Sequence, residues 1–198
     1  MRGRPDVATP SPRGSGIAQQ RILDAAMDLY FEHGVGGTSL QMIADRAGLT
    51  KAAVYYHFQA KEDIVLAVIT PALDAVARLT EAAAAARNRS TAVDILITGL
   101  VDLVLENRRL GAVLWADPTI AQILIGHPAR REIGARIHAQ LIGPNPDAET
   151  RVRAAIFGSS LRIAASPELA EMDTEILRRH MIDNARRLIG VRAPRPVA

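Results

Sequence analysis

The chain has 198 residues, a formal net charge of +3 and no cysteine. This length is enough to bury a core without covalent staples, and the lack of cysteine excludes disulfides and thiolate metal sites and suits a reducing compartment. No apolar run approaches the ~20 residues of a membrane helix, so we expect a soluble, cytoplasmic protein. The charge alone does not indicate nucleic acid, because residues 1–70 carry seven basic and seven acidic side chains.

The first 16 residues, MRGRPDVATPSPRGSG, contain almost nothing to bury. Their Pro, Gly, Ser and Arg content predicts a disordered basic arm over residues 1–16. Two interpretations stay open: a solvated tail, or an arm that reaches phosphates or a minor groove through Arg2, Arg4 and Arg13.

A helix-forming pattern begins at Ile17, where apolar residues start to recur every three or four positions. The glycines from Gly34 onward are predicted to stop this first helix. Thr38 and Gln41 have the spacing of a capping box, which predicts a short helix beginning at Ser39.

A tight turn is predicted at Gly48, and Thr50 can cap a second short helix that ends at Phe58. A further helix is expected to start near Lys61 and to kink or break at Pro71, because the proline ring removes a backbone hydrogen bond. No segment alternates as a strand, so the fold class is predicted to be all-α. Further helices are expected at 91–106, 110–116, 119–125, 129–141, 147–165 and 167–189.

The stretch TKAAVYYHFQAKED, residues 50–63, contains both lysines of the chain and a cluster of aromatic residues. Helical spacing places Val54 and Phe58 on one face, which we assign to the core, and turns Ala53, Tyr56 and His57 outward with Tyr55 at the edge. Two short helices joined by AGL have the dimensions of a helix-turn-helix, whose second helix enters the major groove. The alternative is a short amphipathic helix with half-buried aromatics.

The segment from ILDAAMDLYFEHG through TSLQMIADRAGLTKAAVYYHFQAKED resembles the N-terminal domain of the tetracycline-repressor (TetR) family of transcriptional regulators. The resemblance implies a homodimer with a three-helix DNA-binding domain at residues 17–64 and a larger ligand-binding and dimerising helical domain at 65–190. The last residues, VRAPRPVA, are expected to form a frayed tail at 191–198. Ala52 and Ala60 depart from the residues that many relatives have. The positions that the resemblance assigns to DNA are Thr38, Ser39, Thr50, Lys51, Ala53, Tyr55, Tyr56, His57 and Lys61.

A ligand pocket is implied by the resemblance. The residues that we expect to line an apolar cavity are Leu103, Trp115, Leu124 and Phe157. Asp102, Glu106 and His127 are candidates for its polar contacts. The alternative is that Trp115, the single tryptophan, packs in ordinary core.

Dimerisation is also implied, through two helices that pair with their copies in a four-helix bundle. One helix offers the small residues Ala155, Gly158 and Ser159, and the other offers Ile176, His180 and Met181. The alternative is that both stripes belong to the core of one chain.

An enzyme is not expected, because the histidines are scattered and no metal-binding, nucleophile or phosphate-loop motif occurs. We expect no cofactor and no metal. The predicted function is that of a homodimeric repressor that binds a palindromic double-stranded DNA operator and is released by a largely apolar small-molecule effector. The alternatives are an activator of the same family, or a helical interaction module without DNA binding.

Overall fold

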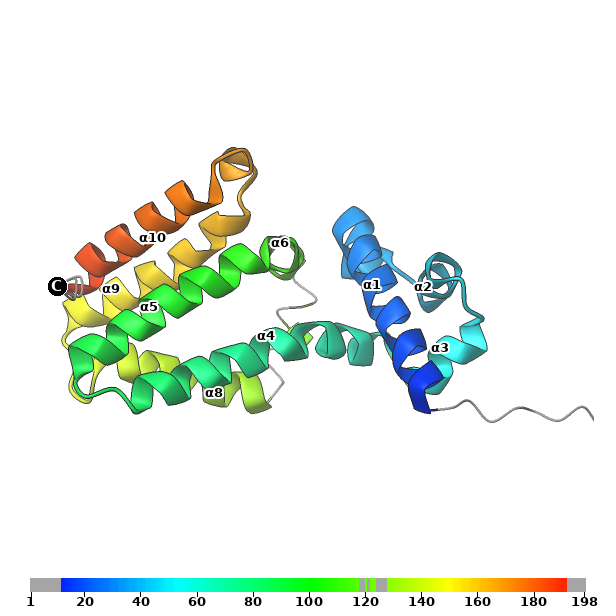
Figure 1. Ribbon diagram of the computed structural model, residues 1–198, viewed down its shortest axis with the longest axis horizontal. Helices are drawn as coiled ribbons and strands as arrows, with labels where there is room; N and C mark the ends of the chain where they lie inside the picture. Colours follow the sequence, from blue (N-terminus) through cyan, green and yellow to red (C-terminus); the bar gives the residue numbers. More distant parts are fainter. Residues whose placement is uncertain (1–11, 118–119, 121, 124–127, 192–198) are drawn as a thin grey trace, which may run out of the picture. The chain divides into compact units, whose positions relative to one another are not determined.

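The computed structural model describes residues 12–117, 120, 122–123 and 128–191. Over these residues the secondary structure is helical, with no strand, which confirms the predicted all-α class (Figure 1). Two compact units are formed, one up to Val68 and one from Ile69 onward. The first holds α1 (Pro12–Gly37), α2 (Leu40–Ala47), α3 (Lys51–His57) and the start of α4 (Lys61–Ala84). The second holds the rest of α4, then α5 (Arg89–Glu106), α6 (Arg108–Ala116), α8 (Pro128–Ile142), α9 (Ala148–Ser160), the 3₁₀ turns η1 (Leu161–Ala165) and η2 (Pro167–Leu169), and α10 (Thr174–Ile189).

Helix α1 begins at Pro12, five residues before the predicted start at residue 17. The boundary of the expected arm at residue 16 is therefore wrong, because a proline fits the first turn of a helix, where its missing N–H is not needed. The regular helix ends at Gly34, whose φ of 71° and ψ of 167° are non-helical, as the glycines predicted. The remainder of the arm, with Arg2 and Arg4, and residues 192–198 of the tail lie outside the described residues.

The cap of α2 is Ser39 and not Thr38, so the predicted capping box is wrong by one position. The Ser39 hydroxyl accepts a hydrogen bond from the Met42 amide at 3.2 Å. Thr38 is unable to cap because its side chain is buried, and its hydroxyl donates to the Gly34 carbonyl at 2.8 Å.

The turn between α2 and α3 depends on Gly48, which has a left-handed φ of 63°. The amides of Gly48 and Leu49 donate to the carbonyls of Asp45 and Ala44, which is the bond pattern of a Schellman motif. A side chain at Gly48 would meet the Arg21 guanidinium at 2.9 Å, and that guanidinium donates to the Ala47 carbonyl. Both backbone strain and the Arg21 contact therefore favour glycine at this turn.

Helix α4 begins at Lys61 as predicted, although the preceding Ala60 has no capping side chain. Asp63 compensates, since its carboxylate accepts hydrogen bonds from the amides of Gln59 and Ala60 at 3.1 and 2.9 Å. The helix continues through Pro71 to Ala84. Of the two outcomes expected at Pro71, a kink or a break, the break is therefore wrong.

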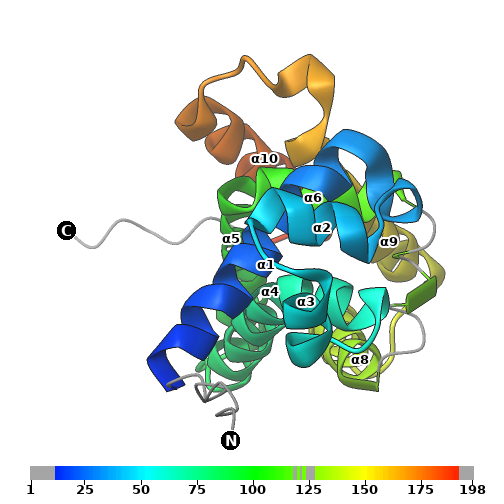
Figure 2. The same ribbon diagram turned by 90° about the vertical axis from the view of Figure 1, so that its right-hand side faces the viewer.

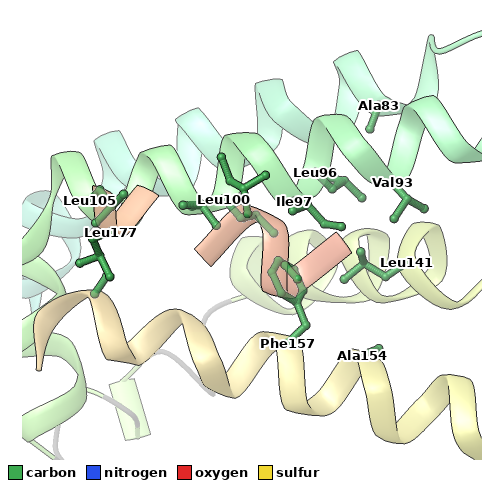
Figure 3. Close-up of a cluster of buried hydrophobic side chains, with 14 residues drawn as sticks. Ala83, Val93, Leu96, Ile97, Leu100, Leu105, Leu141, Ala154, Phe157 and Leu177 are labelled. Atoms are coloured by element: carbon green, nitrogen blue, oxygen red, sulfur yellow. The ribbon is translucent and has the colours of Figure 1, made fainter. Parts of the chain in front are cut away.

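The core of the second unit surrounds α5, whose buried residues include Val93, Leu96, Ile97 and Leu100. Phe157 points from α9 toward α5 in the close-up view (Figure 3). Two ion pairs fasten α10 to α5: Arg178 to Asp102 and Arg186 to Asp94, each through two hydrogen bonds. The same helix α10 also packs beside α9 (Figure 1).

Two predicted helices of the second unit are shorter in the structure. The segment expected at 147–165 is α9 up to Ser160 followed by the 3₁₀ turn η1. The segment expected at 167–189 is η2 and then α10, which starts at Thr174 because Asp173 caps it by accepting from the Ile176 amide at 3.0 Å. The helix expected at 119–125 lies mostly outside the described residues. Among the helices described, none is both long and apolar enough to cross a bilayer.

Candidate nucleic-acid interface and ligand cavity

Helix α3 buries its predicted core face and exposes Tyr55 and Tyr56, whereas Ala53 and His57, which were predicted to point outward, are half-buried. Val54 and Phe58 are buried, whereas the side chains of Tyr55 and Tyr56 are 47% and 72% exposed. Thr50 caps the helix by accepting from the Ala53 amide at 3.1 Å, so the first turn of α3 is fixed by its own sequence. Figure 2 shows α3 following α2 after the short turn. The exposed aromatics are therefore held on a short, capped helix and are available to a partner.

Lys51 lies on the same exposed side of α3. Its ammonium group is 5.8 Å from the centre of the Tyr55 ring, within range of a cation–π contact. The rings of Tyr56 and His57 meet edge to face, with centroids 5.2 Å apart. Lys51 is thus an exposed cation that contacts the face of the Tyr55 ring. Because this contact uses no hydrogen bond, the N–H groups of Lys51 can donate to an anion.

The other cations whose side chains are described in the first unit are engaged. Arg46 forms two hydrogen bonds with Glu32, at 3.0 and 2.7 Å, and this carboxylate raises the pKa of the guanidinium. Arg21 donates to the carbonyl of Ala47 at the end of α2. Lys61 donates to the carbonyls of Val35 and Thr38, at 2.7 and 3.1 Å.

Lys61 therefore has a structural contact that the sequence did not predict. Its ammonium group donates to carbonyls at the end of α1 and before α2, where the helical bond pattern is interrupted. We assign Lys61 this structural role in place of the contact with DNA that the resemblance implied. Thr38 is likewise removed from the candidate contacts, because its side chain is only 2% exposed.

The remaining predicted residues of this interface divide by exposure. Ser39 and Thr50 are exposed, although each hydroxyl also caps a helix. Ala53 and His57 are half-buried. The structure therefore brings together an outward set on the first turns of α2 and along α3, and this set consists of Ser39, Thr50, Lys51, Tyr55 and Tyr56.

The second unit contains a cavity of about 270 Å³ between α4, α5 and α6. Leu103 and Trp115 line it, as predicted. Phe157 does not line it and is 1% exposed within the core, so the prediction that Phe157 shares this cavity is wrong. The reason is that α5 has two apolar faces, and Phe157 packs on the face turned toward α9. Leu124 lies outside the described residues.

The predicted polar contacts of the cavity are not found there. Asp102 is paired with Arg178, Glu106 is exposed and His127 lies outside the described residues. Among the described residues that line the cavity, the polar one is Asn107, at the junction of α5 and α6. The sequence analysis missed Asn107; a capping-type residue between two apolar helices is the signal that could have found it. Groups of three or more metal-binding side chains are absent from the part of the chain described.

The outer face of α9 and α10 carries most of the predicted dimer residues on its surface. Met181 is the exception, since it is half-buried and packs against the core. Two large apolar side chains of α9 are also exposed, namely Val152 at 56% and Ile156 at 49%. The exposed members of the predicted set are Ala155, Gly158, Ser159, Ile176 and His180.

Solved structures share this fold. The transcriptional regulator PfmR from Thermus thermophilus superposes with a TM-score of 0.64 at 21% identity, covering 88% of this chain and 100% of that one. NalD, described as the secondary repressor of the MexAB-OprM multidrug efflux pump in Pseudomonas aeruginosa, superposes with a TM-score of 0.66 at 23% identity, covering 87% and 96%. At these identities the likeness concerns the fold.

Curated proteins of similar sequence are also transcriptional regulators. The regulator SrpR of Pseudomonas putida is 43% identical over 51 residues, which is 26% of this chain but only 24% of SrpR. The regulator Mb3439c of Mycobacterium bovis is 30% identical over 128 residues, which is 64% of this chain and 68% of that protein. A family profile described as bacterial regulatory proteins of the tetR family matches residues 22–68, the segment that contains α2, α3 and the turn between them. The chain belongs to the tetR family of bacterial regulatory proteins.

Proposed function

We propose that this protein is a homodimeric repressor that binds a palindromic DNA operator through α3 and is released by a small molecule bound in the second unit. The observation that carries the proposal is the outward face of α3, where Lys51, Tyr55 and Tyr56 are exposed on a helix whose other face is buried. Large exposed aromatics beside a cation are costly to leave in water and are suited to a partner surface.

Double-stranded DNA fits this face chemically. The ammonium group of Lys51 at the start of α3 suits a phosphate oxygen, and the hydroxyls of Tyr55 and Tyr56 can donate to phosphates while their rings meet thymine methyl groups. Ser39 and Thr50 stand at the first turns of α2 and α3, where backbone amides also favour phosphate. In this proposal Lys61 acts indirectly, since it holds the end of α1 and the start of α2 in place.

A second copy of the chain is the proposed partner of the α9–α10 face. Val152 and Ile156 are one helical turn apart and exposed, with Ile176 of α10 exposed as well. No atom of the described residues lies within 4 Å of the position that a side chain at Gly158 would take, so packing among these residues gives no reason for a glycine in the interior of α9. A helix of the second copy that approaches closely would supply that reason. A two-fold dimer would also set the spacing of two operator half-sites.

The cavity in the second unit is the proposed ligand site. Helix α4 is common to both units: Lys61 at its start bonds to the carbonyls near α1, and Ile69, Leu73 and Val76 further along line the cavity. A ligand that requires a different position of the α4 wall would thus bias the position of the first unit. Repression as the output follows from the family resemblance.

Selection of binding sites from a random duplex pool tests the proposal. The purified protein should retain sequences with a two-fold symmetric consensus, and Tyr56→Ala should lose that enrichment. Adding the protein should then lower transcription from a template that carries the selected site. No enrichment by protein that has been unfolded, freed of ligand and refolded would overturn DNA binding and favour an interaction module. Increased transcription would favour an activator.

A further inference from the structure

Among the described residues, the cavity between α4, α5 and α6 has an almost wholly apolar wall. The described residues that line it are Leu, Ile, Val, Ala, Gly and Trp, with Asn107 as their polar exception. Its volume of about 270 Å³ is just below the roughly 300–1,000 Å³ that is usual for small-molecule pockets. In such a site, a single polar group favours ligands that can bond to it, because a bound ligand that shuts water away from a polar atom without replacing its hydrogen bond is unfavourable.

The side-chain amide of Asn107 donates one hydrogen bond through its nitrogen, whereas its oxygen accepts none among the described residues. The amide nitrogen donates to the Leu103 carbonyl at 2.8 Å. This bond fixes the orientation of the group, since a reversed amide would set two oxygens against each other. The amide oxygen Oδ1 accepts no hydrogen bond within the described residues, and the side chain is half-buried.

The free oxygen is unusual for the position of Asn107. Asn107 is the N-cap of α6, and an asparagine there normally accepts from an amide of the first turn through its side-chain oxygen. Asn107 makes no such bond. It is also the C-cap of α5, and its amide nitrogen returns to the last turn of that helix. The side chain therefore caps α5, its oxygen accepts no bond among the described residues, and Asn107 is one of the residues that line the cavity.

We propose that Asn107 Oδ1 is the specificity-determining acceptor of this cavity, so that the ligand is a compact apolar molecule with a hydrogen-bond donor, such as a hydroxyl or an N–H group. This inference rests on the proposed role of the second unit as a ligand receptor. An acceptor oxygen disfavours a carboxylate. The guanidinium of the neighbouring Arg108 has buried nitrogens without a partner among the described residues, but Arg108 does not line the cavity.

Two isomeric probes test whether the ligand must carry a hydrogen-bond donor. 1-Octanol and 1-methoxyheptane have the same composition, and only the alcohol donates a hydrogen bond. Octanoate serves as the anionic probe. Binding is followed on the full-length protein by the fluorescence of Trp115, the single tryptophan, which itself lines the cavity. The alcohol should bind roughly three- to tenfold more tightly than the ether, the ratio expected for one hydrogen bond.

Asn107→Leu should remove this preference. The affinity for the alcohol should fall, and the affinity for the ether should stay the same or rise. Asn184→Leu, the same substitution at an exposed position of α10, should keep the preference. Thermal unfolding followed by circular dichroism checks that both variants fold, and the comparison of probes on the unaltered protein stands without either.

Four results would overturn the inference: equal affinity for both isomers, a preference that survives in Asn107→Leu, octanoate binding more tightly than octanol, or no binding of any probe by fluorescence and calorimetry. The assay contains no DNA. A protein that prefers octanol but does not bind the selected duplex therefore retains this inference while the proposed repressor function fails.

Discussion

In the first unit the candidate contact residues stand on the surface, and each short helix is fixed by bonds close to it in the chain. Ser39 caps α2, Thr50 caps α3 and Asp63 caps the start of α4. In the second unit the candidate site is a space between three helices, and its wall residues lie on helices that also build the core. We conclude that residues of the first unit that contact a partner can be changed without loss of folding stability. In the second unit, a change of the residues that line the site also changes folding stability.

The largest expected effect is a loss of folding stability in the core of the second unit. Phe157→Ala removes a fully buried ring from between α9 and α5, and we expect a loss of about 3–5 kcal/mol in the free energy of unfolding. Urea denaturation followed by circular dichroism measures it. Phe157→Leu, which keeps most of the volume, is the control and should cost far less. A loss below about 1 kcal/mol for the alanine variant would contradict the tight packing of this core.

The next prediction contrasts the two lysines of the chain, one expected to stabilise the fold and the other to contact DNA. Lys61→Met leaves the carbonyls of Val35 and Thr38 without their charged donor, so the free energy of unfolding should fall by about 2 kcal/mol. Lys51→Met removes an exposed cation and should change it by less than about 0.5 kcal/mol. In a salt titration of affinity for the selected duplex, Lys51→Met should lower the slope by about one, and Lys61→Met should leave it nearly unchanged. The reverse pattern would restore Lys61 as the phosphate contact.

A smaller effect concerns association through α9. Gly158→Leu places a bulky side chain on the exposed face and should raise the dimer dissociation constant about tenfold or more, equivalent to at least about 1.4 kcal/mol. Gly134→Leu is the matched control, because Gly134 of α8 is also exposed and also has open space around it. Both changes favour helix formation equally. Equal dissociation constants by analytical ultracentrifugation would place the interface elsewhere.

The smallest effect is expected at Tyr30 of α1. Its hydroxyl is buried and has no partner among the described residues, so Tyr30→Phe should leave the free energy of unfolding unchanged or raise it by up to about 1 kcal/mol. Burial, with a smaller contribution from Glu62, raises the pKa of Tyr30 above its ordinary value of 10.0. The folded state therefore keeps the proton longer than the unfolded chain does, and stability falls as the pH rises above 10.0. Tyr30→Phe should remove part of this alkaline loss, and thermal unfolding across that range measures it.

The helix-turn-helix could be predicted because its signals are local. Gly48, Thr50 and the Val54–Phe58 spacing act within one or two helical turns, so the sequence alone fixes the turn, the cap and the buried face. The second unit was predicted less well. The start of α10 was placed seven residues too early, and Phe157 was assigned to the wrong side of α5, because both depend on packing between segments distant in the chain.

The sequence by itself determined the all-helical class, the family and the outward face of α3, since capping, glycine conformation and helical periodicity operate between near neighbours. Only the tertiary structure decided the roles of Lys61 and Asn107. Lys61 finds its carbonyls 26 and 23 residues away along the chain. Asn107 comes to line a cavity because α4, α5 and α6 meet around that space. Such roles depend on which groups three-dimensional packing brings together and which it leaves without a partner.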